Sequence, residues 1–205
     1  MKKRIAQVTR KTSETNIVVK LNVDGKGISK VDTGIGFLDH MLILFSFWGF
    51  FDLEVIAKGD LKIDIHHTNE DIGIVLGQAF KKALADKKGI KRIGFAQAPM
   101  EKVVGNVVLD INGRGFLNLN AYEEIGGSST APDKKEGYEF EDAKHFFDGL
   151  AKNLGMNLNI RIDYANRDLH ATLEPIFKAL GIALDQATQI DPRRKGIPST
   201  KGVID

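Results

Sequence analysis

Hydrophobic residues alternate with polar ones in some parts of the chain and recur at helical spacing in others. Alternation over residues 17–23, just before an Asp-Gly pair, predicts a half-buried strand that enters a turn. Spacing of three and four over 66–85 predicts an amphipathic helix, and the apolar run 37–47 predicts a mostly buried one. The same reasoning predicts strands at 52–57, 104–111, 116–120 and 157–163, a loop at 124–137, and helices at 140–153 and 169–188. We expect the strands at 104–111 and 116–120 to form a hairpin with Arg114 at its tip.

Part of the chain is repeated. The segment 66–70, His-His-Thr-Asn-Glu, aligns with 170–174, His-Ala-Thr-Leu-Glu, at an offset of 104 residues, and the match continues along both helices. His40 and His145 lie 105 residues apart on the preceding predicted helices. We therefore predict an internally duplicated α+β fold in which each half is a mostly antiparallel sheet packed on two helices. The predicted divisions are a first half at 1–90, a second half at 91–190 and a basic tail at 191–205.

The composition narrows the classes of function. Hydrophobic residues make up 42% and charged residues 27% of the 205 residues, which is typical of a globular protein. The net charge is only +2, and no long basic stripe precedes the tail, so nucleic acid is a poor candidate partner. No apolar run has the length of a signal peptide or a membrane span. The absence of cysteine excludes disulfides and thiolate metal sites, and it fits a reducing cytoplasm.

The repeated segment carries candidate metal ligands. Residues three and four apart share a helix face, so Glu70 can converge with His66 or His67, and Glu174 with His170. Imidazole and carboxylate together suit manganese, iron, cobalt, nickel or zinc. The alternative is that these histidines cap helices or form hydrogen bonds in the core. We favour metal binding, because a structural need does not usually repeat the same His and Glu in both halves, and the other two histidines, His40 and His145, are also at matching positions.

A second group of residues is cationic. It comprises Arg92, Arg114, Lys178 and, in the tail, Ser199 and Lys201. Hydroxyl, ammonium and backbone N–H groups near glycine can hold a phosphate, which makes 191–205 a candidate phosphate-binding tail. Without the metal motif, the preferred interpretation would be a solvated basic tail.

Five ordered motifs resemble the imidazoleglycerol-phosphate dehydratase family, and the likeness covers almost the whole chain. They are Thr33 to Leu42, Gly59 to Leu61, His66 to Asp71, Phe177 to Ala179 and Pro198 to Gly202. The resemblance implies a lyase of histidine biosynthesis that converts imidazoleglycerol phosphate to imidazoleacetol phosphate and water. It also implies a 24-subunit homo-oligomer with paired manganese ions at subunit interfaces and a phosphorylated small molecule as substrate.

The resemblance also implies roles for particular residues. One manganese ion would take His66, His145, His170 and Glu174, and a second would take His40, His67 and Glu70. Phosphate contacts map onto Arg92, Arg114, Lys178, Ser199 and Lys201, whereas Glu14 and Glu101 match the acid–base positions.

Four positions depart from the family pattern. Ala171 replaces a histidine ligand of the second metal, and Trp48 replaces a histidine that contacts substrate. Glu101 replaces an aspartate, and Asn159 replaces a strand histidine. An indole cannot ligate a metal or accept a proton from carbon. Two alternatives therefore stay open: a divergent paralogue that acts on another phosphorylated substrate or with one metal, and a binding or assembly protein without catalysis.

Overall fold

A computed structural model describes residues 3–120, 134–163 and 168–204. Each half of the chain contains the same succession of elements, namely three strands, a helix, a strand and a helix. The first half comprises β1 (Ile5–Lys11), β2 (Thr15–Asn22), β3 (Ser29–Asp32), α1 (Gly36–Trp48), β4 (Asp52–Gly59) and α2 (His66–Leu84). The second comprises β5 (Ile93–Met100), β6 (Val103–Asp110), β7 (Phe116–Asn120), α3 (Phe140–Leu154), β8 (Asn157–Asp163) and α4 (Leu169–Thr188).

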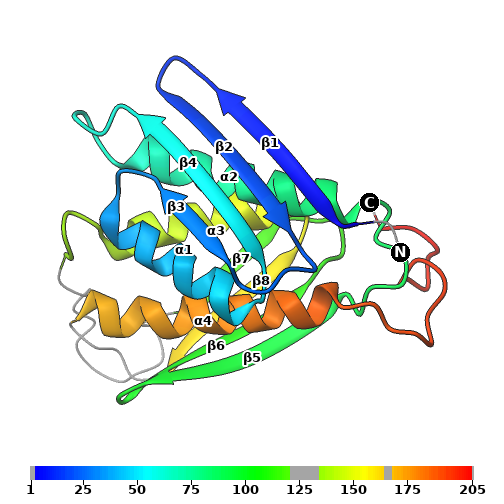
Figure 1. Ribbon diagram of the computed structural model, residues 1–205. Coiled ribbons are helices and arrows are strands. Elements are labelled where there is room, and N and C mark those ends of the chain that lie inside the picture. Colours follow the sequence, from blue (N-terminus) through cyan, green and yellow to red (C-terminus); the bar gives the residue numbers. More distant parts are fainter. Residues whose placement is uncertain (1–2, 121–133, 164–167, 205) are drawn as a thin grey trace.

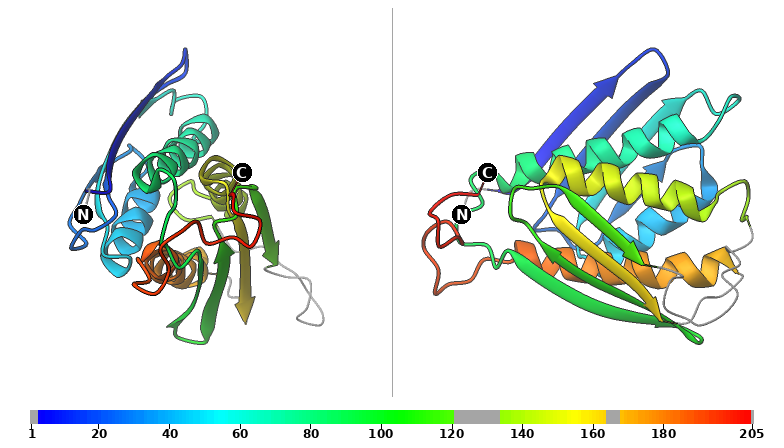
Figure 2. Two further views of the ribbon diagram at one scale, coloured as in Figure 1. Left: turned by 90° about the vertical axis from the view of Figure 1, so that its right-hand side faces the viewer. Right: turned by 180° about the vertical axis from the view of Figure 1, so that it is seen from behind.

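The two sheets have equivalent topologies. Their strand orders are β1-β2-β4-β3 and β5-β6-β8-β7, and in each sheet only the last pair is parallel. The duplicated α+β fold and its mostly antiparallel sheets are therefore confirmed. The end-on view in Figure 2 shows the four helices as an inner layer between two outer sheets. Each sheet consequently presents one face to the helices and leaves the other exposed, as the alternating burial along β2 and β6 requires.

The helices pair across the two halves. α2 packs on α3, and α4 packs on α1, so that each pair has one helix from each half. Glycines at equivalent repeat positions allow the close approach: a Cβ at Gly77 would lie 2.7 Å from the Leu150 carbonyl oxygen, and one at Gly181 would lie 2.5 Å from that of Phe45. All four helices begin at the same end of the molecule (Figure 1). Side chains in their first turns are thereby brought together.

The predicted hairpin is wrong. β6 and β7 are not neighbours, because β8 lies between them, antiparallel to β6 and parallel to β7. The turn between β6 and β7 is attached instead to the end of α3: Gly113 N donates to the Gly155 carbonyl oxygen at 2.8 Å, and Gly115 packs against the backbone of Lys152. β7 therefore pairs with β8 on the side opposite β6.

The other sequence-predicted elements agree with the structure to within a few residues, but β1, β3 and β5 were not predicted. The segment predicted as a loop at 124–137 falls largely outside the described residues. None of the described helices combines the length and the apolar character that a membrane crossing demands.

Candidate metal and phosphate sites

One cluster of candidate ligands lies between α1 and α4. His40 Nε2 is 3.2 Å from His170 Nε2 and 3.4 Å from Glu174 Oε2, which in turn is 2.8 Å from His170 Nε2. Lys178, one turn further along α4, forms an ion pair with the other Glu174 oxygen. Burial alone would raise the pKa of Glu174, but the hydrogen bonds from Lys178 and His170 hold it below its usual value. We call His40, His170 and Glu174 the α1–α4 group.

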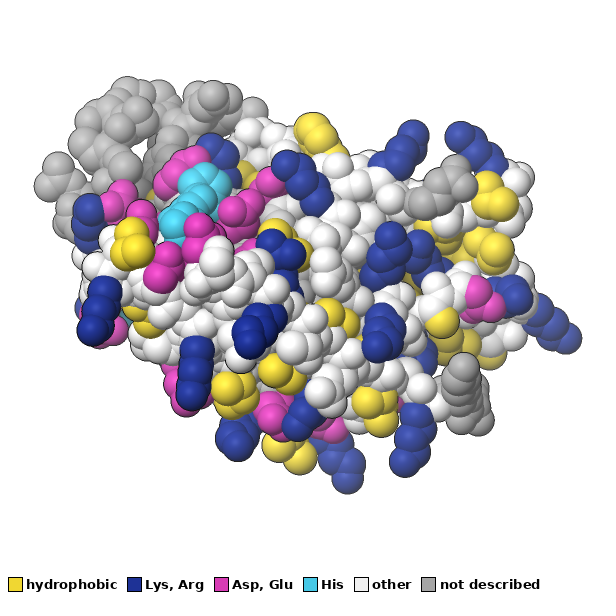
Figure 3. All heavy atoms as spheres, turned by 90° about the horizontal axis from the view of Figure 1, so that it is seen from above, with side chains coloured by type: hydrophobic (Ala, Val, Ile, Leu, Met, Phe, Trp, Pro, Cys, Tyr) yellow, Lys and Arg dark blue, Asp and Glu magenta, His cyan; other side chains and the backbone are white. Residues whose placement is uncertain are grey.

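A second cluster lies between α2 and α3, and we call it the α2–α3 group. It consists of His66, Glu70, Asp142 and His145. Ligand atoms of His66, Asp142 and His145 all lie within 4.8 Å of one another, and Glu70 Oε2 is 3.6 Å from His66 Nε2. The rings of His66 and His145 meet edge to face, with centroids 4.5 Å apart. Burial raises the pKa of Asp142, and the negative charges of Glu139 and Asp64 act in the same direction. Figure 3 shows histidine side chains surrounded by Asp and Glu at this end of the molecule.

The two groups are related by the internal repeat. Each joins a histidine from the first helix of one half to the His-x-x-x-Glu segment on the second helix of the other half. The expected ligand sets differ from this arrangement. Within one chain, His170 and Glu174 lie with His40, and it is Glu70 that lies with His66 and His145. Helix pairing across the halves is the cause, because it determines which first-turn residues meet.

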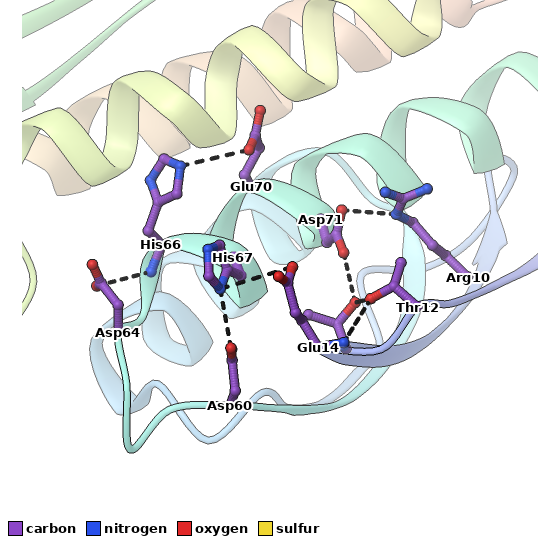
Figure 4. A network of polar contacts seen from close by, with 10 residues as sticks. Arg10, Thr12, Glu14, Asp60, Asp64, His66, His67, Glu70 and Asp71 are labelled. Carbon is purple, nitrogen blue, oxygen red and sulfur yellow. Dashed lines mark hydrogen bonds and ion pairs between the residues drawn. The ribbon is translucent and has the colours of Figure 1, made fainter.

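His67 points toward Asp60 and Glu14 (Figure 4), and its ring centroid is 5.9 Å from that of His66. Its Nδ1 is 3.1 Å from Asp60 Oδ2 and 3.9 Å from Glu14 Oε2. The hydrogen bond with Asp60 raises the pKa of His67, and the charge of Glu14 acts in the same direction. With Nδ1 donating to a carboxylate, Nε2 keeps its lone pair available as a ligand.

A polar network holds Glu14 beside the start of α2 (Figure 4). Thr12 Oγ1 accepts hydrogen bonds from the backbone N–H groups of Glu14 and Thr15, at 3.1 and 2.9 Å. Asp71 accepts from Thr15 Oγ1 at 2.5 Å and from Arg10 Nε at 2.7 Å. Because Asp71 is on α2, the turn that carries Glu14 is fixed relative to the helix that carries His67.

Four of the five predicted phosphate residues line one small pocket. It has a volume of about 160 Å³ and is lined by Arg92, Asn112, Arg114, Ser199, Thr200, Lys201 and Val203. Arg92 is anchored there by a two-pronged pair with Asp110, at 2.5 and 2.8 Å, and by donation to the Pro198 carbonyl oxygen. The fifth residue, Lys178, lies instead beside Glu174. The pocket presents cationic, hydroxyl and amide groups, which together suit a phosphate.

The remaining candidates lie outside both metal groups. Glu101 is exposed in the turn between β5 and β6, with a φ of 51°. Trp48 ends α1, two helical turns from His40, and its side chain is 42% exposed and meets Phe47 edge to face. Ala171 is buried next to His170 and brings no ligand.

Sequence reasoning missed residues that brace the α2–α3 group. Asn69 is fully buried, donates from Nδ2 to the Asp142 carbonyl oxygen at 2.7 Å and accepts from the Tyr138 hydroxyl at 2.8 Å. Asn69 is inside the repeated segment, but its counterpart is Leu173, so the repeat gave no signal for it. Asp142 precedes His145 by three residues, a spacing that places both on one helix face and that could have revealed it.

Comparisons with known proteins identify the family to which this chain belongs. The profile of a family described as imidazoleglycerol-phosphate dehydratase matches residues 33–184. The chain belongs to the imidazoleglycerol-phosphate dehydratase family. It is 47% identical over 205 residues to a protein of that name from Maridesulfovibrio salexigens, with 100% of both chains covered. It is 48% identical over 202 residues to one from Pelobacter propionicus, with 98% of this chain and 99% of that one covered.

Solved structures of this dehydratase family share the fold. The Staphylococcus aureus imidazoleglycerol-phosphate dehydratase superposes with a TM-score of 0.77 at 33% identity, covering 91% of this chain and 99% of that one. The Pyrococcus furiosus structure, solved in complex with (S)-C348, gives a TM-score of 0.78 at 32% identity, covering 96% and 99%. Similarity therefore extends over both halves of the dehydratase fold, including the segments that carry the histidine groups.

Proposed function

We propose that this chain is a metal-dependent hydro-lyase that converts imidazoleglycerol phosphate to imidazoleacetol phosphate and water in histidine biosynthesis. The observation that carries the proposal is the coexistence, in a member of this family, of two histidine–carboxylate groups and a separate phosphate pocket. We assign the two halves to 1–90 and 91–190 and the phosphate-binding tail to 191–205, and we expect the enzyme in the cytoplasm.

The residues of both groups fit a divalent transition metal. They offer imidazole and carboxylate donors, and His145 Nδ1 is buried without a hydrogen-bond partner among the described residues. His40, His170 and Glu174 would hold one ion, and His66, Glu70 and His145 the other, with His67 available at the edge. A bound metal would stabilise negative charge that develops on the substrate's imidazole ring. We propose manganese as the native ion.

The α1–α4 group and the phosphate pocket lie near opposite ends of α4. Arg92 N donates to the Ala187 carbonyl oxygen near the end of α4, whereas His170 and Glu174 are near its beginning. At 1.5 Å per residue, Glu174 and Ala187 are about 20 Å apart along the helix. An imidazole ring on a three-carbon phosphate ester is too short for that span. We therefore propose that the active site is completed by a second copy of the chain, within a homo-oligomer that we expect to be a 24-mer.

The chain's own residues account for the remaining chemistry. Glu14, held by its turn beside the start of α2, accepts the proton from the second carbon from the imidazole ring. The hydroxyl on the carbon next to the ring leaves with a proton as water, and the enol that forms between the two carbons becomes the ketone. Arg92, Arg114, Ser199 and Lys201 of a second copy hold the phosphate, so binding energy remote from the reacting carbon orients it.

Turnover of the proposed substrate tests the function directly. Purified protein loaded with Mn²⁺ should form imidazoleacetol phosphate from imidazoleglycerol phosphate, and the ketone can be followed by its absorbance. No ketone from the metal-loaded assembly would refute the proposal. Thermal stabilisation by other sugar or azole phosphates, but not by imidazoleglycerol phosphate, would instead favour the divergent paralogue that Trp48 and Ala171 suggest.

Removal of metal should weaken the assembly. An ion that takes a further ligand from a second copy, as the family resemblance implies, binds the assembled form more tightly, so a chelator should shift the large particle toward smaller species. Light scattering with and without chelator measures the shift, and re-addition of Mn²⁺ should reverse it. An unchanged mass after complete metal removal, verified by elemental analysis, would show that assembly does not depend on coordination.

A further inference from the structure

The α2–α3 group contains an acid that the sequence had not marked as a ligand. Asp142, half-buried in the first turn of α3, places a carboxylate oxygen within 4.8 Å of a ring nitrogen of both His66 and His145. Two imidazoles and a carboxylate at this separation form a set of donors around a common point. Such a set of donors is typical of a site for a divalent transition metal.

The two oxygens of Asp142 have different environments. Oδ2 accepts the Glu139 backbone N–H at 2.8 Å and so closes the capping box at the start of α3. No hydrogen bond from the described residues reaches Oδ1. The cap therefore fixes the rotamer of the side chain while it leaves one oxygen available for coordination.

The backbone of Asp142 is also fixed relative to the other ligands. Its carbonyl oxygen accepts a hydrogen bond from Asn69 Nδ2 at 2.7 Å, and Asn69 is the residue before Glu70. Asn69 is itself oriented by the buried hydroxyl of Tyr138. The Asn69 side chain thereby joins the first turns of α2 and α3, which fixes the position of Asp142 relative to the helix that carries His66.

The internal repeat shows that this acid is not a requirement of the fold. At the offset of 105 residues that relates His145 to His40, the counterpart of Asp142 is Phe37. Phe37 is buried in the first turn of α1 and packs edge to face on His170, with centroids 5.8 Å apart. An apolar ring thus occupies, beside the α1–α4 group, the position that an acid occupies beside the α2–α3 group. The two groups consequently differ in their number of carboxylates.

We propose that Asp142 is a metal ligand of the α2–α3 group, where its carboxylate and the imidazoles of His66 and His145 supply three donors from a single chain, with Glu70 next to His66. This inference rests on the proposed function, because it takes both groups to bind divalent metal. A carboxylate donor from within the chain makes this ion less dependent on a ligand from a second copy of the chain.

The test is Mn²⁺ binding to metal-free protein, measured by calorimetry for the wild type, Asp142→Asn and Glu141→Gln. The asparagine oxygen can still accept the Glu139 N–H, so the capping box is preserved and only the charge is lost. Asp142→Asn should weaken one of two binding events by on the order of 10- to 100-fold. Glu141 lies in the same helical turn, 3.7 Å from His145 Nε2 but outside the cluster of ligand atoms. Its substitution should leave both affinities within about 2-fold of the wild type, because Glu141 is exposed, is hydrogen-bonded by Lys144 at 2.7 Å and is beyond hydrogen-bond distance of His145.

A double-mutant cycle identifies the site. In a His145→Ala background, Asp142→Asn should add little further loss, whereas in a His170→Ala background it should keep its full effect. Two results would show that Asp142 is not a ligand: equal losses of Mn²⁺ affinity in Asp142→Asn and Glu141→Gln, or unchanged affinities in Asp142→Asn. Neither result would affect the proposed function. Wild-type protein that binds no Mn²⁺ would overturn the proposed function as well, so the two failures are distinguishable.

Discussion

Replacing Glu14 with glutamine should lower kcat by about 10²- to 10⁴-fold, the usual contribution of a positioned acid–base group. Glutamine has nearly the same shape but cannot accept a proton, so the loss should fall on kcat far more than on KM. Glu14 belongs to neither metal group, and it lies 3.9 Å from His67 Nδ1. The metal content should therefore be unchanged. Steady-state kinetics and elemental analysis of the same preparation measure both quantities.

Glu54→Gln is a matched control for this prediction. Glu54 is paired with Lys20 at 3.0 Å on the exposed face of the first sheet, and its loss should leave kcat within about 2-fold of the wild type, since surface ion pairs contribute little. A Glu14→Gln enzyme with more than a tenth of wild-type kcat would remove Glu14 from the role of principal base. His67, which is next to it, would then be the first residue to examine.

Much of the fold could be predicted because it depends on local pattern. The apolar spacing over 66–85 and the repeat at an offset of 104 residues were sufficient to predict α2, α4 and the duplication. A pattern of this kind identifies which face of a helix is buried. It does not identify the partner, so the pairing of α2 with α3 and of α4 with α1 could not be predicted.

The candidate site was predictable to the same extent. All seven predicted metal ligands are in the first two turns of their helices, but the division of six of them into two groups follows from helix pairing. The hairpin prediction was wrong for a related reason. The sequence Asn-Gly-Arg-Gly is typical of a turn, but nothing in it shows that β8, which follows α3 in the chain, pairs between β6 and β7. Such long-range pairings depend on the packing of the whole domain.

A mixture of two inactive variants should recover activity. His170→Ala removes a ligand from the α1–α4 group, and Lys201→Glu places a negative charge in the phosphate pocket. Each variant alone should be nearly inactive. In a particle assembled from equal amounts of both, a site that takes its metal group from one copy and its pocket from another is intact in about one quarter of cases, if copies mix at random. Activity per site should therefore rise to about 25% of the wild type.

The same particles distinguish a composite site from one contained in a single chain. If a single chain held the whole site, the two variants could not complement each other, because every chain in the mixture carries one of the two lesions. The matched control mixes wild-type chains with chains that carry both substitutions. Such particles should retain about one half of the activity for a single-chain site and about one quarter for a composite one. Two results together would establish a site shared between copies: recovered activity in the first mixture, and one quarter of the wild-type activity in the second. Such a site is what the distance of roughly 20 Å between Glu174 and Ala187 along α4 requires.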